Sequence, residues 1–177
     1  HGLLRGQSTT RSGPLLAAIP VFFGSWKRKS AGYGQIDTVV HSGPKLMGTM
    51  AYTVNYIDVA TYWQIPVAQL GKGETTTRHS VGVIASRLPW QLRGLHPDSG
   101  SEFVNGVLLA WCHNRRIALT RSRPNKKNDN CYIEQRNRTL VREYVGYARY
   151  DCPEAVAVMN ELYAALTLYV NFFQPTY

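Results

Sequence analysis

Hydrophobic and polar residues alternate along the first half of the chain in the manner of half-buried β-strands. Residues 32–41 are rich in β-branched side chains, residues 50–56 alternate large apolar with smaller or polar positions, and residues 62–70 form a third apolar run. Glycines and Pro44 separate the first two runs and mark a turn. The pattern predicts three strands, and the simplest arrangement for them is an antiparallel meander.

The hydrophobic spacing then changes from the period of a strand to that of a helix. Val81, Ile84, Ala85 and Leu88 recur at i, i+3, i+4 and i+7, which predicts an amphipathic helix. Pro89 directly follows this run and should end the helix.

Shorter elements are predicted further along the chain. A strand over residues 92–96 should end before Asp98, where Ser99 and Glu102 have the S-x-x-E spacing of a helix capping box. Residues 116–120 read as a fifth short strand, and residues 130–145 as a helix. A last helix should follow Pro153, with an inward stripe of Val156, Met159, Tyr163, Leu166, Val170 and Phe173.

The order of these elements predicts an α/β domain with a mixed five-stranded sheet and helices on both faces. The ribonuclease H-like fold has this order, although other folds share it. Residues 1–31 read as an N-terminal arm or linker, because they are rich in Gly, Ser, Thr and Arg and have no sustained period. Residues 32–177 would form the one folded core.

Composition and charge narrow the functional classes. No stretch approaches the roughly 18 apolar residues of a membrane span, so no membrane partner is expected. Three cysteines without CxxC spacing favour free thiols in a reducing compartment. The net charge is +9, and residues 111–150 carry ten basic and three acidic side chains. A nucleic acid would explain this concentration of positive charge, and a solvated basic surface explains it equally well.

Three carboxylates occupy positions that can carry chemistry. Asp37 lies in the middle of an apolar strand, where a carboxylate is costly unless it is paired or binds a cation. The alternative for Asp37 is an edge strand that faces water. Asp98 alone could be a turn aspartate, and Glu134 alone could be a first-turn residue that favours the helix dipole.

The three positions can also converge at the carboxyl edge of a small mixed sheet. Clustered carboxylates repel unless cations bridge them, and sites rich in oxygen select Mg²⁺ or Mn²⁺. Two such ions can activate an attacking oxygen and stabilise a leaving one. Cations that could bring DNA phosphate to such a site stand just before Glu134 in the chain: Arg121, Arg123, Lys126 and Lys127.

The motifs around these residues resemble the catalytic core shared by retroviral integrases and many bacterial insertion-sequence transposases. Asp98 and Glu134 are separated by 35 residues, the spacing of the family's second and third acidic residues. Residues 97–103 resemble the family motif D-x-G-x-E-F, and residues 120–135 resemble the approach to its catalytic Glu. The resemblance covers roughly residues 8–175. The departures, which include Ser99 and Asn125, remove none of the three carboxylates.

The resemblance implies a DDE triad of Asp37, Asp98 and Glu134 that holds two Mg²⁺ or Mn²⁺ ions. The implied activity is cleavage of DNA at an element's 3′ end followed by strand transfer into target DNA. It further implies a homo-oligomer, at least a dimer, in the bacterial cytoplasm at the nucleoid. Asp58 would belong to a structural turn. The candidate DNA contacts are Arg121, Arg123, Lys126, Lys127, Gln135 and Arg138.

Three other interpretations remain open. The chain could be a non-catalytic DNA-binding or assembly remnant of a transposase, in which one acidic ligand would be expected to be lost. A different ribonuclease H-like nuclease would generally use four carboxylates. A basic α/β domain without a site would leave the convergent motifs unexplained.

Overall fold

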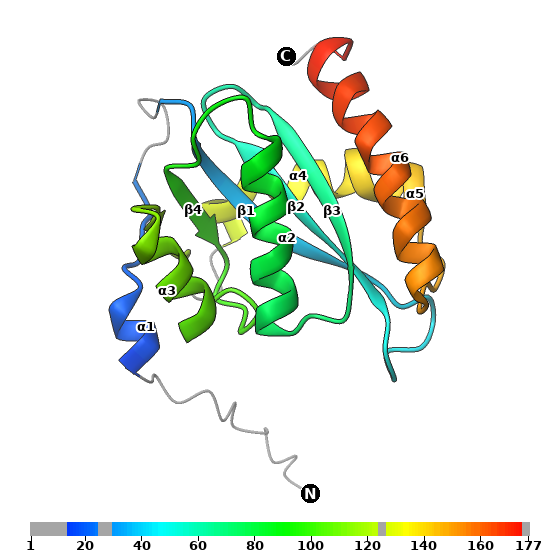
Figure 1. Ribbon diagram of the computed structural model, residues 1–177, viewed down its shortest axis with the longest axis horizontal. Helices are drawn as coiled ribbons and strands as arrows, with labels where there is room; N and C mark the ends of the chain where they lie inside the picture. The colour runs from blue at the N-terminus through cyan, green and yellow to red at the C-terminus, as the bar shows by residue number, and fades with distance from the viewer. Residues whose placement is uncertain (1–13, 25–29, 124–126, 175–177) are drawn as a thin grey trace, which may run out of the picture.

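A computed structural model describes residues 14–24, 30–123 and 127–174 and has a five-stranded sheet at its centre (Figure 1). The strand order is β3-β2-β1-β4-β5. The strands are β1 (Tyr33–His41), β2 (Ala51–Asp58), β3 (Gln64–Leu70), β4 (Gly94–Pro97) and β5 (Ala118–Leu119).

The sheet is mixed, as the sequence predicts. β1 pairs antiparallel with β2, and β2 pairs antiparallel with β3, so the predicted meander is confirmed. β4 pairs parallel with both β1 and β5. The α/β fold with helices on both faces of a mixed five-stranded sheet is therefore confirmed.

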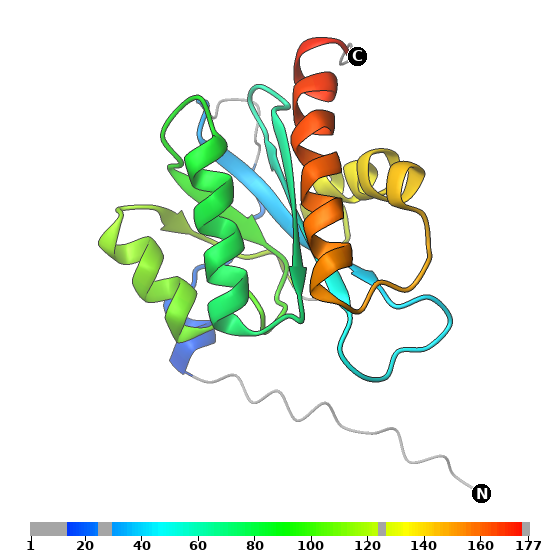
Figure 2. The ribbon, with the colours of Figure 1, turned by 45° about the vertical axis from the view of Figure 1, so that its right-hand side comes forward.

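Helices cover the sheet on two sides (Figure 2). One side carries α2 (Glu74–Arg87) and α3 (Gly106–Asn114). The other side carries a bent helical segment and the long last helix. These elements are α4 (Cys131–Arg136), the π-helical η2 (Asn137–Arg142), α5 (Glu143–Val145) and α6 (Pro153–Phe172).

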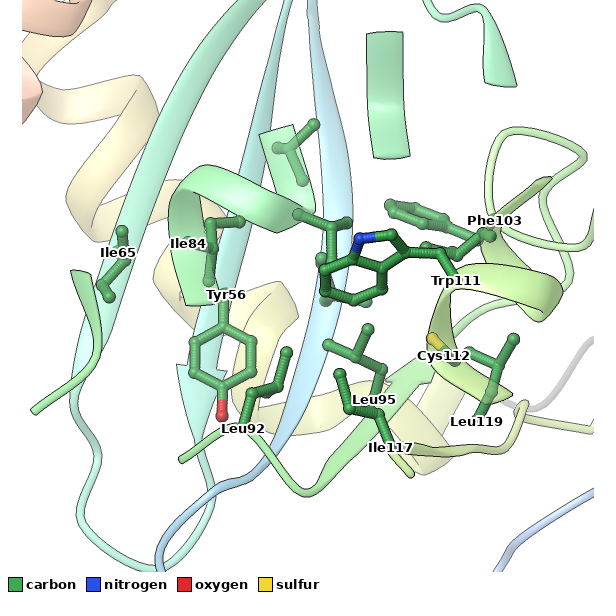
Figure 3. Close-up of a cluster of buried hydrophobic side chains, with 14 of the residues drawn as sticks. Tyr56, Ile65, Ile84, Leu92, Leu95, Phe103, Trp111, Cys112, Ile117 and Leu119 are labelled. Atoms are coloured by element: carbon green, nitrogen blue, oxygen red, sulfur yellow. The ribbon is translucent and has the colours of Figure 1, made fainter. Parts of the chain in front are cut away.

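The larger core lies between the sheet and α2 and α3 (Figure 3). Alternate residues of β2, Val54 and Tyr56, point into it and are fully buried. Ile84 from α2 and Leu95 from β4 meet them there, together with Phe103. Burying each such side chain stabilises the fold by about 1.5–3 kcal/mol. Ile36 of β1 is buried in the same core, which therefore packs β1 and β4 together against the helices.

A second core lies beneath α6. Met159, Tyr163, Leu166 and Val170 are buried at helical spacing and pack on the opposite face of the sheet from the larger core. The predicted inward stripe is thus correct over most of its length. Phe173, which was expected to complete it, is 76% exposed, because α6 ends at Phe172 and the stripe ends with it.

α6 is long and apolar enough to cross a membrane by length and composition alone. Two asparagines of α6 bind it to the sheet. Asn160 donates to the carbonyl of Ala68 and accepts from its amide, at 3.0 and 2.9 Å. Asn171 does the same with Gln64, at 2.8 and 2.9 Å. The two asparagines therefore bind the open edge of β3, which would otherwise present unpaired backbone groups.

Replacing both asparagines with Ala should destabilise the protein. The change leaves backbone groups of Ala68 and Gln64 without partners, which costs about 1–3 kcal/mol for each group that stays buried. We expect urea denaturation to show a loss of about 2–4 kcal/mol, with more aggregation on refolding. Asn114→Ala, on the exposed end of α3, is the control. Equal stability of the double variant and this control would contradict the role of the asparagines.

The predicted capping box at Ser99 and Glu102 is wrong. Residues 98–104 form turns, and the helix begins only at Gly106. Asn105 caps it, because its side-chain oxygen accepts from the amide of Leu108 at 2.8 Å. Glu102 is unable to cap a helix here because its carboxylate is bound elsewhere, by the hydroxyl of Thr38 in β1.

Part of the segment expected to be an arm packs on the core. α1 (Pro14–Ala18) leads into Ile19, which is 1% exposed and belongs to the larger core. Val21 then forms a parallel bridge with Arg121, beyond the end of β5. Through this isolated bridge, residues 20–22 lie alongside Arg121, just past β5.

Candidate functional site

Asp37 and Asp98 lie side by side at the carboxyl end of β4. β1 and β4 run parallel, and their register pairs Ile36 with Pro97. Asp37 follows Ile36 in β1, and Asp98 follows Pro97 at the end of β4. Neighbouring strands lie about 4.8 Å apart, so the register brings the two carboxylates close together. This register places two of the three predicted site residues on neighbouring segments, and their role as metal ligands stays a prediction.

Negative charges on Asp37 and Asp98 are unfavourable in the folded protein. Burial, together with the nearby charges of Asp98 and Glu102, raises the pKa of Asp37 to about 7. Hydrogen bonds from the backbone of Thr38 and from Asn137 act in the opposite direction. Burial also raises the pKa of Asp98, as does the charge of Glu102. Such shifts are typical of carboxylates gathered at functional sites.

Glu102 is a third carboxylate at this place, and the sequence interpretation missed it. Its Oε1 accepts from the hydroxyl of Thr38 at 3.0 Å, directly beside Asp37 in β1. The turn over residues 98–104 folds back so that Glu102 lies near Asp98 as well. The signal was present in the motif of residues 97–103, where Glu102 was interpreted as part of a helix cap.

Asn137 connects Asp37 to the helical segment on the other side of the sheet. Its Nδ2 donates to Oδ2 of Asp37 at 2.8 Å, and its Oδ1 accepts from Nδ2 of Asn55 at 3.0 Å. Asn55 is the residue opposite Asp37 in the β1–β2 register. The amide of Thr38 donates to Oδ1 of Asp37 at 2.7 Å. Both carboxylate oxygens are therefore held in place.

The helix predicted over residues 130–145 is interrupted by a π-helical stretch. η2 begins at Asn137, the residue that bonds Asp37. A π-turn adds a residue to the helical repeat and so changes the direction of the side chains that follow, and such turns are frequent at functional sites. Arg142 ties the end of η2 to β1 by donating to the carbonyl of Val40 at 2.8 Å.

Glu134 lies in the first turn of α4, with an exposed side chain. It precedes Asn137 by three residues, a rise of about 4.5 Å along a helix. Within residues 14–24, 30–123 and 127–174, no group of three His, Cys, Asp or Glu side chains is arranged to hold a metal ion. The convergence of Glu134 with Asp37 and Asp98 therefore stays a prediction.

The donor set of Asp37 and Asp98 fits a divalent cation. Carboxylate oxygens are the ligands that Mg²⁺ and Mn²⁺ prefer. The described residues form two ion pairs, Arg123–Asp129 and Arg149–Asp151, and neither involves these carboxylates. The charge of Lys72 lowers the pKa of Asp98. A metal ion would relieve the repulsion between the two carboxylates that the surrounding protein leaves in place.

The basic residues predicted to contact DNA have varied surroundings. Arg121 donates to the backbone carbonyls of Ile19 and Leu16, at 3.1 and 3.3 Å. Arg123 binds Asp129 through two side-chain nitrogens, at 2.9 and 2.8 Å. The side chains of Gln135 and Arg138 are exposed on the helical segment of Glu134. Lys126 and the side chain of Lys127 lie outside the described residues.

Asp58 is a structural residue, as the family resemblance implies. Its two oxygens accept hydrogen bonds from the amides of Gly32, Ala60 and Thr61, at 2.6, 3.1 and 3.0 Å. The hydroxyls of Thr61 and Tyr56 also donate to it. These bonds close the turn after β2 and fix the start of β1, away from Asp37.

Comparison with known proteins places the fold. No family model matches the chain. An uncharacterized protein of Sinorhizobium fredii, y4rM, is 37% identical in an alignment 185 residues long. The alignment covers 98% of this chain and 51% of that protein. The chain thus spans about half the length of this curated relative.

Two solved structures have the same fold at low sequence identity. A simian T-cell lymphotropic virus intasome in complex with a PP2A regulatory subunit, B56 gamma, aligns with a TM-score of 0.65 at 13% identity, over 90% of this chain and 55% of the viral chain. The HTLV-2 integrase catalytic core in complex with magnesium, in its dimeric form, aligns with a TM-score of 0.59 at 14% identity, over 81% and 88%. The chain therefore has the ribonuclease H-like fold of integrase catalytic cores.

Proposed function

We propose that the chain is the catalytic core of a DNA transposase or integrase that uses a DDE triad. The observation that carries the proposal is the placement of Asp37 and Asp98 side by side on an integrase-type fold. The 35-residue spacing between Asp98 and Glu134 supports it as well. Glu134 stands on the helical segment that Asn137 joins to Asp37.

In this proposal Asp37 and Asp98 would hold a first Mg²⁺ or Mn²⁺ ion, and Glu134 would hold a second. When bound, two such ions activate an attacking oxygen and stabilise a leaving oxygen in phosphoryl transfer. The reaction is hydrolysis of a phosphodiester at an element's 3′ end, after which the freed 3′-hydroxyl attacks a phosphodiester of the target DNA and displaces the 3′-oxygen of the target strand as its leaving group. It needs no nucleophilic side chain.

The surrounding residues orient the carboxylates. Asn137 and the amide of Thr38 each donate to one oxygen of Asp37, which fixes the plane of its carboxylate. The amide of Gly100 donates to Oδ1 of Asp98 at 2.8 Å and restrains it in the same way. Orientation of this kind by outer residues is typical of metal sites.

DNA is the proposed partner, both as element end and as target. The excess of ten basic over three acidic side chains in residues 111–150 supports a polyanionic ligand. Of the candidate contacts, Gln135 and Arg138 are exposed on the helical segment that carries Glu134. An oligomer at the bacterial nucleoid belongs to the same proposal, and the dimeric form of the HTLV-2 integrase core supports it.

The test compares metal-dependent nicking of element-end DNA by the full-length protein and by a Glu134→Gln variant. We expect nicking with Mg²⁺ or Mn²⁺ and a loss of at least about 100-fold in the variant, since a carboxamide is a poor metal ligand. Glu143→Gln, an exposed residue at the start of α5, is the matched control and should retain activity.

Equal nicking by the Glu134→Gln variant and the wild type would refute the role of Glu134. Binding of DNA by the wild type without nicking under any divalent metal would refute the catalytic proposal. That second result would favour the alternative function, a DNA-binding or assembly remnant of a transposase.

A further inference from the structure

Gln35 is a buried polar residue close to the proposed site. It lies in β1 two positions before Asp37, so the two side chains leave the strand on the same face. Its exposure is 0%. A buried amide must have hydrogen-bond partners, because leaving it without them costs about 1–3 kcal/mol. Its partners therefore indicate what the residue does.

Among the described residues, the side chain of Gln35 makes three hydrogen bonds, one just before α4 and two in its first turn. Its Nε2 donates to the carbonyl of Asp129 at 2.8 Å. Its Oε1 accepts from the amides of Tyr132 and Ile133, both at 3.1 Å. These contacts join residues that are almost 100 positions apart in sequence, with separations of 94, 97 and 98.

The two amides are the ones that a capping side chain normally satisfies. Cys131 is the first residue of α4, so Tyr132 and Ile133 occupy its second and third positions. An N-cap side chain usually accepts from these amides. Asn130 holds the N-cap position, yet its side chain makes no capping hydrogen bond among the described residues. Gln35 supplies that bond from a different strand of the fold.

We propose that Gln35 is a positioning residue that sets the start of α4 and thereby holds Glu134 for its metal. Glu134 follows Ile133 directly, so the bond at Ile133 fixes the backbone from which Glu134 extends. The same strand carries Asp37 two residues later. Gln35 therefore couples the two sides of the proposed site through one rigid strand. This role rests on the proposed function.

A purely structural glutamine provides the matched control. Gln69 is also buried, at 4% exposure, and its side chain bonds the carbonyl of Gly71 and the hydroxyls of Thr77 and Ser80. It lies in β3, two strands away from β1. Gln69→Met should destabilise the fold much as Gln35→Met does, while leaving the proposed site intact.

The first measurement is hydrogen exchange of the peptide that covers the start of α4 in the full-length protein. We expect Gln35→Met to speed exchange at Tyr132 and Ile133 by at least about 10-fold, because both amides lose their acceptor. Gln35→Glu keeps an acceptor oxygen and should restore most of the protection. Unchanged exchange in Gln35→Met would overturn the capping role.

The second measurement is Mn²⁺ binding by calorimetry, at a temperature where all variants are folded. We expect Gln35→Met to weaken Mn²⁺ binding at least about 10-fold, within the range seen for residues that orient metal ligands. Gln69→Met should bind as the wild type does. Normal Mn²⁺ binding by Gln35→Met would overturn the positioning role alone, whereas a wild type that binds no Mn²⁺ would overturn the proposed function and this role with it.

Discussion

An Asp37→Asn variant should be more stable than the wild type at pH 8 and at the same time lose DNA cleavage. The carboxylate of Asp37 is held beside Asp98 and Glu102, and burial raises its pKa from 3.8 to about 7. Above that pH the wild type keeps an unfavourable charge that Asn lacks. We expect a gain of about 2 kcal/mol, less than the full pKa difference, because part of the side chain faces water.

The sign of the pH dependence follows from the raised pKa. Between about pH 4 and pH 7 the folded protein retains a proton on Asp37 that the unfolded chain releases. The stabilising contribution of that proton is complete below the unfolded pKa and is lost as pH rises through about 7. Urea denaturation should therefore show wild type and variant nearly equal at pH 4 and increasingly different toward pH 8.

A divalent metal should reverse this order. Mg²⁺ or Mn²⁺ binds the folded wild type and should raise its unfolding midpoint at pH 8, but not that of Asp37→Asn. The rise should be smaller at pH 5, where protons compete for the carboxylate. Glu161→Gln, an exposed change on α6, is the control and should follow the wild type throughout. A variant that is less stable than the wild type at pH 8 would contradict the electrostatic interpretation.

Cleavage should fall by at least about 100-fold in the same Asp37→Asn variant. A variant that is more stable but inactive identifies Asp37 as a functional carboxylate, because replacing a structural residue lowers the stability of the protein. Retained cleavage in a more stable variant would place the metal elsewhere.

Much of the architecture could be predicted because it depends on local patterns. The alternation in residues 50–56 reflects a strand with different surroundings on its two faces, and Val54 and Tyr56 point into the larger core as expected. The placement of Asp37 within a strand and of Asp98 just after one also follows from sequence. The parallel register of β1 and β4 then brings both residues side by side where β4 ends, while β1 continues to His41.

The residues that surround the carboxylates could not be predicted in this way. Gln35, Asn137 and Glu102 act through partners that lie tens of residues away, with separations of 98, 100 and 64. No periodicity in a single sequence encodes such contacts. Glu102 even had a plausible local function as a helix cap, and that prediction failed because the tertiary bond to Thr38 replaced it.

Asp58→Asn should have the opposite effect on stability from Asp37→Asn. Asp58 is fully buried and accepts five hydrogen bonds, three of them from backbone amides. A carboxamide replaces one acceptor oxygen with a donor, which would face the amide of Gly32 or that of Thr61. Burying two opposed donors should cost about 3 kcal/mol. Metal binding should persist in any folded fraction.

Urea denaturation at pH 8 measures both aspartates in one assay. We expect Asp58→Asn to lower the free energy of unfolding and Asp37→Asn to raise it, although both remove one negative charge from the same sheet. Asp58 has backbone donors at each oxygen, whereas Asp37 has one backbone donor and one side-chain donor and also lies near two other carboxylates, whose charges oppose its own. A similar shift in both variants would mean that net charge, and not local pairing, governs the stability of these residues. If the two shifts have opposite signs, the charge of Asp37 does not stabilise the fold, and Asp37 is therefore the aspartate to assign to catalysis.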